Sequence, residues 1–293
     1  MKIIISIPAY NEEKTLPEVL KNIKNVMAGT KYNYKILVLD DGSTDKTAEV
    51  AKKLGAIVYS NSRNLGLAVT FKEEIKKCLE LNADIIIHTD ADGQYYAEDI
   101  IRLIKEIEDG YDLVLGSRFT DKNIVTPFFK RMGNRAFAKV LSRMLKMKLT
   151  DTTTGFRAFR RDVARNINFI NTFTYTQEQI IKAAKQNFKI KEIGIKTRKT
   201  RESRLFSNPL EYAIKAWINI LRIYRDYEPL KFFGRIGFIL ISIGALIGLW
   251  LLYLFITIGK VGHIPLTVLS MLLIIAGIQV VIFGFLADMQ KNE

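Results

Sequence analysis

The chain has 293 residues, carries 44 Lys and Arg against 30 Asp and Glu for a net charge of +14, and is 48% hydrophobic. This length allows one large domain, or one domain with an appendage. The single cysteine excludes an intrachain disulfide and agrees with a reducing compartment. Two histidines exclude a histidine-rich zinc site, and the missing glycine-rich phosphate-binding patterns disfavour a dinucleotide enzyme or a P-loop hydrolase.

The N-terminal region alternates short apolar runs with stretches of helical spacing. The runs expected to be strands are Ile3–Ile7, Ile36–Leu39, Ile57–Tyr59, Ile85–His88 and Leu113–Leu115. The stretches expected to be helices are Leu16–Val26, Thr47–Leu54, Leu67–Leu81 and Ile100–Glu108. This order predicts an α/β fold, a mostly parallel sheet with helices on both faces. The first run is too short for a signal peptide.

Polar residues follow four of these strands, where ligands bind in such sheets. The segments are Pro8–Glu12, Asp40–Asp45, Asn61–Gly66 and Asp90–Gln94. In the last of them, two carboxylates one residue apart form a hard anionic site that suits Mg²⁺ or Mn²⁺. An Asp-x-Asp alone is a weak signal, since a solvated turn explains it equally well. Four consecutive polar strand ends are harder to explain by turns, because gathered carboxylates repel unless a cation or donors join them.

With these motifs the sequence resembles the family 2 glycosyltransferases of GT-A fold, and within them the polyprenyl-phosphate sugar synthases typified by dolichol-phosphate mannose synthase. The resemblance runs from Lys2 to about Phe206. It implies a nucleotide-sugar donor (GDP- or UDP-linked) and a polyprenyl phosphate acceptor. The donor-binding candidates are Pro8, Tyr10, Glu12, Asp40, Asp41, Arg63, Asp90 and Ala91. The metal candidates are Asp90, Asp92 and Gln94.

The same resemblance indicates where the acceptor phosphate is held. The candidates are Arg118, Thr153, Arg201 and Arg204, and the catalytic set is Asp92, Arg118, Arg201 and Arg204. Arg131 is a further candidate, although it is not part of the resemblance, and a role facing lipid is equally open for it. Arg204 stands where the family commonly has Lys, which keeps the cation but changes its geometry. The family inverts configuration at the anomeric carbon. Asp151 and Glu178 could orient these cations or act as a base, and a structural role for each stays open.

The segment between Lys122 and Thr150 contains no acidic residue, and its cations are interleaved with apolar side chains. A basic amphipathic helix over about 127–148 is therefore expected, and this pattern suits a membrane surface. A nucleic-acid-binding helix or an ordinary solvated face are the alternatives, and we expect no nucleic-acid partner. The stretch 209–227 has aromatic and cationic residues typical of an interface.

Two uncharged stretches follow, Ile236–Ile258 and Ile264–Leu286. Each would form a helix of about 35 Å, enough to cross a hydrocarbon core of about 30 Å. The short link predicts an antiparallel transmembrane hairpin, and the cations before it place the large region in the cytoplasm. The expected organisation is a catalytic domain over 1–206, a juxtamembrane helix over 207–230 and the hairpin over 231–293. Glycines in the spans allow close packing or self-association into a homo-oligomer, or simply face lipid.

Three functions remain at this stage. The leading one is metal-dependent, inverting transfer of one sugar to dolichyl or undecaprenyl phosphate at the cytoplasmic membrane face. The alternative is a membrane glycosyltransferase that uses a glycolipid or polysaccharide acceptor. The third is a non-catalytic membrane scaffold, against which the intact Asp90, Asp92 and Gln94 set argues.

Overall fold

The computed structural model describes residues 1–119, 128–167, 175–198, 217–218, 221–260 and 264–290. The chain divides into two compact units, Met1–Ala213 and Ile214–Glu293. Each unit is described by itself below.

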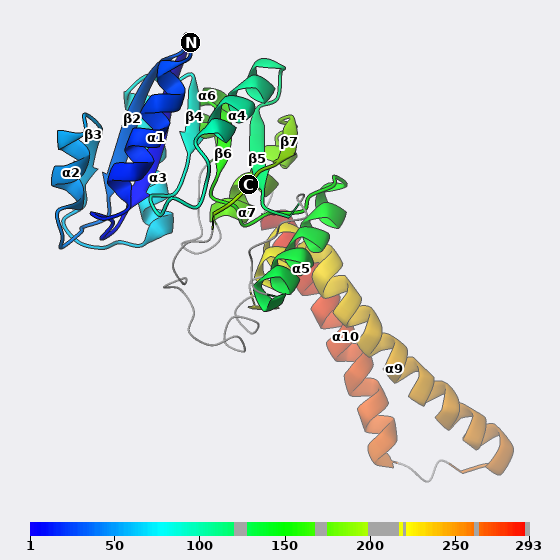
Figure 1. Cartoon of the computed structure of the whole chain (residues 1–293). Coiled ribbons are helices and arrows are strands. Elements are labelled where there is room, and N and C mark those ends of the chain that lie inside the picture. The colour runs from blue at the N-terminus through cyan, green and yellow to red at the C-terminus, as the bar shows by residue number, and fades with distance from the viewer. Residues whose placement is uncertain (120–127, 168–174, 199–216, 219–220, 261–263, 291–293) are drawn as a thin grey trace. The chain divides into compact units, whose positions relative to one another are not determined.

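The first unit is built on a seven-stranded sheet (Figure 1). Its strands are β1 (Lys2–Ala9), β2 (Asn33–Asp40), β3 (Ile57–Ser60), β4 (Ile85–His88), β5 (Leu113–Ser117), β6 (Arg157–Arg160) and β7 (Ile190–Gly194). They lie in the order β3-β2-β1-β4-β6-β5-β7. Only β6 runs antiparallel to its neighbours β4 and β5, so the prediction of a mostly parallel sheet is confirmed.

Helices cover both faces of this sheet. They are α1 (Leu16–Ala28), α2 (Thr47–Lys53), α3 (Leu67–Glu80), α4 (Glu98–Glu108), α5 (Phe128–Leu145), α6 (Arg161–Asn166) and α7 (Tyr175–Lys185). Successive residues of a strand point to opposite faces. In β1, Ile3, Ile5 and Ile7 therefore pack in one cluster with α1 and α4, whereas Ser6 hydrogen-bonds Glu74 of α3 on the other face.

The five predicted strands and four predicted helices are all present, but β6 and β7 were not predicted. Their sequences explain the omission: β6 begins and ends with arginine, and β7, at the edge of the sheet, has two consecutive charged residues, Lys191 and Glu192, at its centre. β6 has a consequence for the site. Because it runs opposite to its neighbours, it starts at the edge where β4 and β5 end, and it brings residues 153–157 to that edge.

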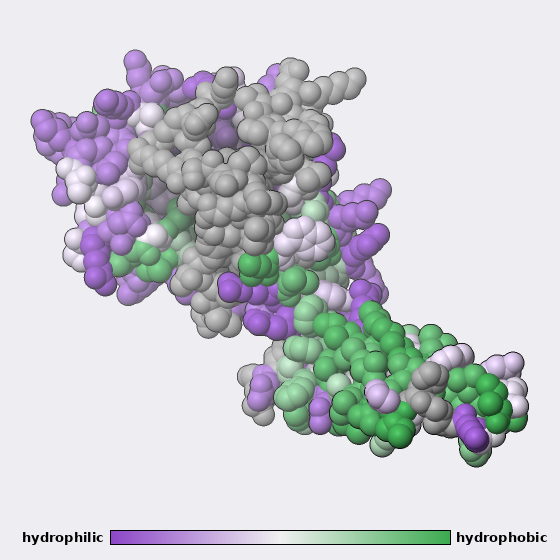
Figure 2. All heavy atoms as spheres, turned by 90° about the horizontal axis from the view of Figure 1, so that it is seen from below, coloured by the Kyte–Doolittle hydropathy of each residue, from purple (hydrophilic) through white to green (hydrophobic). Residues whose placement is uncertain are grey.

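The second unit contains two long apolar helices, α9 (Pro229–Ile258) and α10 (Ile264–Gln290), both long and apolar enough to cross a membrane. Both expected spans are helical, and each helix extends beyond the uncharged stretch at its end away from the link. Apolar side chains dominate the surface of this hairpin, whereas the coloured surface of the first unit in the same view is largely hydrophilic (Figure 2). Of the juxtamembrane stretch, residues 221–227 are helical.

Five glycines of the hairpin lie where its two helices touch: Gly237, Gly244, Gly248, Gly277 and Gly284. A Cβ on Gly237 would lie 2.6 Å from the Gly277 carbonyl oxygen, and one on Gly284 would lie 2.9 Å from Phe233 Cβ. The Ser270 hydroxyl donates a hydrogen bond of 2.7 Å to the Gly244 carbonyl across the same contact. These residues pack α9 against α10, as small residues do in membrane helices. They therefore give no support to self-association.

Candidate functional site

The carboxyl ends of β2, β1 and β4 lie next to one another, so the polar segments that follow them are neighbours. Pro8 is buried within β1, and Tyr10 just after it is 36% exposed. Glu12 is buried, and its Oε2 accepts a 2.6 Å hydrogen bond from the Thr15 hydroxyl. Asp40 Oδ1 accepts the Ser43 backbone N–H at 3.1 Å. The donor-binding candidates of the first two strands are thus brought together at one edge.

Asp41 has a structural task at this edge. Its Oδ1 accepts hydrogen bonds from Asn61 Nδ2 at 2.9 Å and the Leu65 N–H at 3.0 Å, and its Oδ2 accepts the Gly66 N–H at 2.9 Å. Gly42 permits this arrangement, because its φ is +71° and a Cβ there would lie 2.4 Å from the backbone of the loop after β3. Asp41 therefore braces that loop, where Arg63 is exposed, and its contact with a donor remains a prediction.

Asp90, Asp92 and Gln94 follow β4 directly. Asp92 Oδ1 accepts the Gln94 backbone N–H at 3.0 Å. Ala91 is buried, while both carboxylates are only partly covered. Burial, and next the neighbouring charge of Asp92, raise the pKa of Asp90. The two carboxylates thus repel each other in a partly desolvated place.

Gly155, in the turn before β6, packs against this pair. A Cβ on Gly155 would lie 2.9 Å from Asp90 Oδ1 and 3.2 Å from Oδ2. The missing side chain lets the turn approach the carboxylate without displacing it. The role of this glycine could not be predicted, because the contact joins residues on two strands that are neighbours only in the folded sheet.

The donor set fits a hard divalent cation that is bound together with a ligand. Among the described residues, no three His, Cys, Asp or Glu side chains group so as to hold a metal ion by themselves. Carboxylate and amide oxygens such as those of Asp90, Asp92 and Gln94 are ligands of the kind that Mg²⁺ or Mn²⁺ prefers, and such ions usually keep water or substrate phosphates as further ligands. A cation there would also offset the repulsion that raises the pKa of Asp90.

A cavity of about 330 Å³ opens beside the two carboxylates. Its lining includes side chains of α1, Tyr95 and Tyr96 after the metal candidates, Phe156 and Arg198. Arg198 closes one side: its guanidinium lies 4.4 Å over the Tyr96 ring, and its backbone N–H donates to the Gln94 carbonyl at 2.9 Å. Nothing in the sequence singles out Arg198, which is one cation among several in a basic stretch.

Arg118, at the end of β5, is held by a buried carboxylate. Its Nε donates to Asp151 Oδ2 at 2.7 Å and its Nη2 to Asp151 Oδ1 at 3.0 Å, while Nη2 also donates to the Thr153 hydroxyl at 2.8 Å. A guanidinium has five N–H donors, and these bonds use the Nε and Nη2 groups, so the two of Nη1 stay available within the described contacts. Arg118 and Thr153, both predicted to hold phosphate, thus lie together.

The structure favours a positioning role for Asp151 over a role as base. Burial alone would raise its pKa, but the Arg118 guanidinium outweighs that effect and lowers the pKa of this carboxyl. Glu178 lies in α7, is 1% exposed and forms an ion pair of 2.8 Å with Lys182. His88 is fully buried, as expected from its strand, with its Nδ1 2.7 Å from Glu74 Oε1.

The remaining acceptor candidates are described only in part. Arg201 and Arg204 lie outside the described residues, and for Arg131 the structure describes the backbone, in α5. The expected helix over about 127–148 is present as α5, which packs against α7. Arg135, Lys139 and Arg143 form an exposed stripe on it, whereas Phe137 and Leu141 are buried. Contact of this helix with a membrane remains a prediction.

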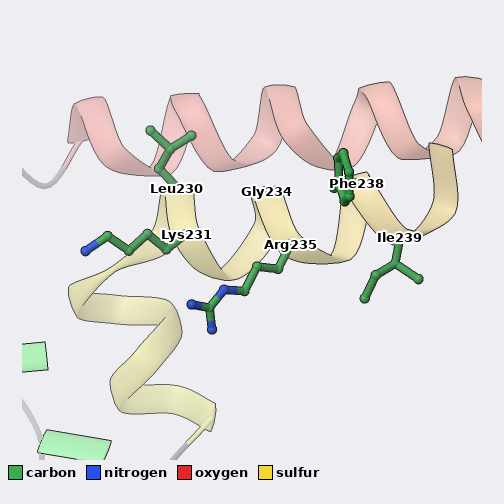
Figure 3. Close-up of a pocket in the computed structure, with 6 residues that line it drawn as sticks. All are labelled: Leu230, Lys231, Gly234, Arg235, Phe238 and Ile239. Carbon is green, nitrogen blue, oxygen red and sulfur yellow. The ribbon is translucent and has the colours of Figure 1, made fainter. Parts of the chain in front are cut away.

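The second unit carries a separate cationic hollow at the start of α9. Lys231 and Arg235, one turn apart, project away from α10, while Leu230 projects toward it (Figure 3). Lys231 pairs with Glu228 at 2.7 Å, and Arg235 lies 5.7 Å from the Tyr224 ring centre. Phe238 and Ile239 continue the hollow with apolar side chains. Cations above apolar residues are typical of the end of a membrane-spanning helix.

Known proteins resemble this chain in sequence. An uncharacterized protein of Methanocaldococcus jannaschii is 40% identical over 203 residues, which cover 67% of this chain and 81% of the relative. A dolichyl-phosphate hexose transferase of Haloferax volcanii is 33% identical, over 64% of this chain and 78% of its own length. A dolichol-phosphate mannosyltransferase of Pyrococcus furiosus is 28% identical, over 93% of this chain and 78% of its own length.

The solved structures agree on the fold. Glucosyl-3-phosphoglycerate synthase of Mycobacterium tuberculosis, solved with Mn²⁺, UDP and phosphoglyceric acid, superposes with a TM-score of 0.59 over 75% of this chain and 78% of its own. Its sequence identity of 20% limits this likeness to the fold. The profile described as "Glycosyl transferase family 2" matches residues 4–167, more than half of the chain. The chain therefore belongs to glycosyl transferase family 2 and is a glycosyltransferase.

Proposed function

We propose that this enzyme transfers one sugar from a nucleoside-diphosphate donor to a polyprenyl phosphate, with inversion, at the cytoplasmic face of a membrane. The observation that carries the proposal is the pair Asp90 and Asp92 at the end of β4, in a family 2 glycosyltransferase whose second unit has two helices long enough to span a membrane. Relatives named as dolichyl-phosphate hexose transferase and dolichol-phosphate mannosyltransferase support the same acceptor.

On the donor side, Pro8, Tyr10, Glu12 and Asp40 would contact the nucleoside at the ends of β1 and β2. Asp90, Asp92 and Gln94 would hold Mg²⁺ or Mn²⁺. Such an ion supplies positive charge to the diphosphate as it leaves the sugar. The domain would supply a preformed site for the cation and the diphosphate, because Gly155 has no side chain that would displace the Asp90 carboxylate.

On the acceptor side, the nucleophile is a phosphate oxygen that is already an anion. It forms a bond to the anomeric carbon from the face opposite the diphosphate, whose C–O bond breaks with the electron pair going to the diphosphate. This reaction needs orientation more than proton removal, which agrees with the ion-paired state of Asp151. Arg118 would bind the phosphate through Nη1, with Thr153 beside it, and Arg131, Arg201 and Arg204 would complete the cationic site.

The membrane face follows from charge. The exposed cations of α5 and the pair Lys231 and Arg235 in α9 would lie toward anionic lipid headgroups on the cytoplasmic side. Each such cation contributes about 1 kcal/mol near an anionic surface. The acceptor, with its phosphate head and isoprenoid tail, would then present its phosphate at the height of the catalytic domain.

The test uses the full chain purified in detergent, with Mg²⁺ or Mn²⁺ and a panel of radiolabelled GDP- and UDP-sugars. Label in the organic phase is counted with and without a short-chain polyprenyl phosphate, for the wild type, for Asp92→Ala and for the matched control Asp109→Ala, which changes an exposed carboxylate at the end of α4.

We expect lipid labelling that requires the polyprenyl phosphate, disappears in Asp92→Ala and persists in the control. Donor hydrolysis without lipid labelling would contradict the proposal and favour a glycolipid or polysaccharide acceptor. Equal labelling by Asp92→Ala and wild type would contradict the metal-binding role of the pair.

A further inference from the structure

Glu192, in the strand β7 that the sequence did not predict, contacts the segment that holds Arg118. Glu192 lies in β7 opposite Leu115 of β5, three residues before Arg118 on that neighbouring strand. Its Oε1 accepts the Asp151 backbone N–H at 2.7 Å. Its Oε2 accepts the N–H of Thr150 at 2.8 Å and the hydroxyl of Thr150 at 2.9 Å. Three donors from two consecutive residues therefore converge on one carboxylate.

The segment that Glu192 holds is the one that orients the arginine. The backbone of Asp151 is fixed by Glu192, and the side chain of Asp151 grips Arg118 with both oxygens. We infer that Glu192 is a positioning residue that sets the direction of the Arg118 guanidinium through Thr150 and Asp151. The inference rests on the proposed function for what Arg118 binds. The contacts that run from Glu192 through Thr150 and Asp151 to Arg118, called the relay below, all lie within the first unit.

A neutral side chain would serve poorly in this place. Glutamine offers one acceptor oxygen, and its NH₂ group would face the Thr150 donors, whereas a carboxylate accepts on both oxygens. The charge is also costly here, because burial, and then the nearby charge of Asp151, raise the pKa of Glu192. Both carboxylate oxygens are used, so the positions of Thr150 and Asp151 depend on this side chain.

The first experiment reads the arginine directly. The full chain in detergent micelles is labelled with ¹⁵N at the arginine Nε, and the Arg118 signal is assigned by its loss in Arg118→Lys. We expect its Nε–H to exchange with solvent at least about tenfold faster in Glu192→Gln than in wild type, since its bond to Asp151 is loosened. Glu106→Gln is the matched control: this carboxylate pairs with Lys191, the neighbour of Glu192 in β7, at 2.6 Å.

The second experiment is a double-mutant cycle on sugar transfer. With saturating donor, Glu192→Gln should lower kcat/KM for a short-chain polyprenyl phosphate by about 10–100-fold, as loss of a supporting partner does at other sites. KM for the donor should stay within about twofold of wild type. In the Arg118→Lys background, Glu192→Gln should cost less than about twofold, because the group it positions is already changed. Glu192→Asp, which keeps the charge but withdraws its oxygens, should behave like Glu192→Gln.

The outcomes separate this inference from the proposed function. An unchanged Arg118 signal in Glu192→Gln, or equal losses of transfer in the Arg118 and Arg118→Lys backgrounds, would overturn the relay. Changed exchange of Arg118 in an enzyme that labels no polyprenyl phosphate would support the relay while contradicting the lipid acceptor.

Discussion

Two acidic pairs end neighbouring parts of the same sheet, and they use their oxygens in opposite ways. After β2, Asp41 accepts three hydrogen bonds from the loop that follows β3. After β4, Asp92 accepts one backbone N–H from its own turn, and Asp90 has a side-chain hydrogen bond with Tyr95 and lies against Gly155. The first pair shapes a loop and the second stays open to a ligand. Two adjacent carboxylates in a sequence thus carry little meaning until their partners are known.

The largest expected effect comes from the open pair. Asp92→Asn should lower sugar transfer by about 10²–10³-fold, the range for losing one group that stabilises developing charge. Folding stability should hold or rise, since the variant removes the repulsion that raises the pKa of Asp90. Transfer rates and urea unfolding measure the two quantities, with Asp109→Asn as the control. If Asp92→Asn transfers sugar at the wild-type rate and is equally stable, Asp90 and Asp92 would only shape a loop, as Asp41 does.

Gly155→Ala should follow, because its Cβ would lie 2.9 Å from Asp90 Oδ1 and the carboxylate must move. We expect Mn²⁺ affinity, measured by electron paramagnetic resonance with a nucleoside diphosphate present, to fall by about 10–100-fold. In the control Gly29→Ala the nearest atom to the new Cβ is 3.7 Å away, and affinity should not change. Equal Mn²⁺ affinity in both variants would remove the glycine from the site.

Asp41→Asn should affect folding more than chemistry. An amide cannot accept on both sides, so at least one of the three loop donors loses its bond to Asp41, at a cost of about 1.5–3 kcal/mol in the free energy of unfolding. Transfer by the folded fraction should drop only a few-fold. Thermal and urea denaturation test the first expectation. A loss of donor affinity at unchanged stability would instead assign Asp41 to the ligand.

The smallest effect is expected for Asp151, the carboxylate that forms an ion pair with Arg118. The Arg118 guanidinium lowers the pKa of Asp151 in the fold below its unfolded value of about 3.9. Its stabilisation is therefore fully present above about pH 4 and is lost as the pH falls through the folded pKa. Between pH 5 and 2.5, the free energy of unfolding should fall more steeply with decreasing pH in wild type than in Asp151→Asn. Identical slopes would mean that the pair contributes nothing to stability.

The sequence predicted what local patterns encode. Buried isoleucine runs placed β1 and β4, and the Asp-x-Asp motif after β4 marked the open pair. For Asp151 the sequence left orientation of the cations, a role as base and a structural role open, and the fold shows it paired with Arg118, 33 residues away. The contact of Gly155 with Asp90 was not predicted. β6 was missed because a buried strand was expected to be apolar, whereas Arg157 is fully buried there with its Nη1 donating to Gln179 at 2.8 Å.

The antiparallel strand β6 has a mechanical consequence. The chain leaves the sheet edge just after Arg118, forms α5, and returns to the same edge at the Gly155 turn. Both attachment points of this insertion, Arg118 and Gly155, therefore belong to the candidate site, and α5 lies between them along the chain. If α5 rests on lipid as proposed, a change in the tension or charge of the bilayer would shift α5 and, with it, the residues around Arg118 and Gly155. The membrane would then regulate the rate of sugar transfer, as an effector does.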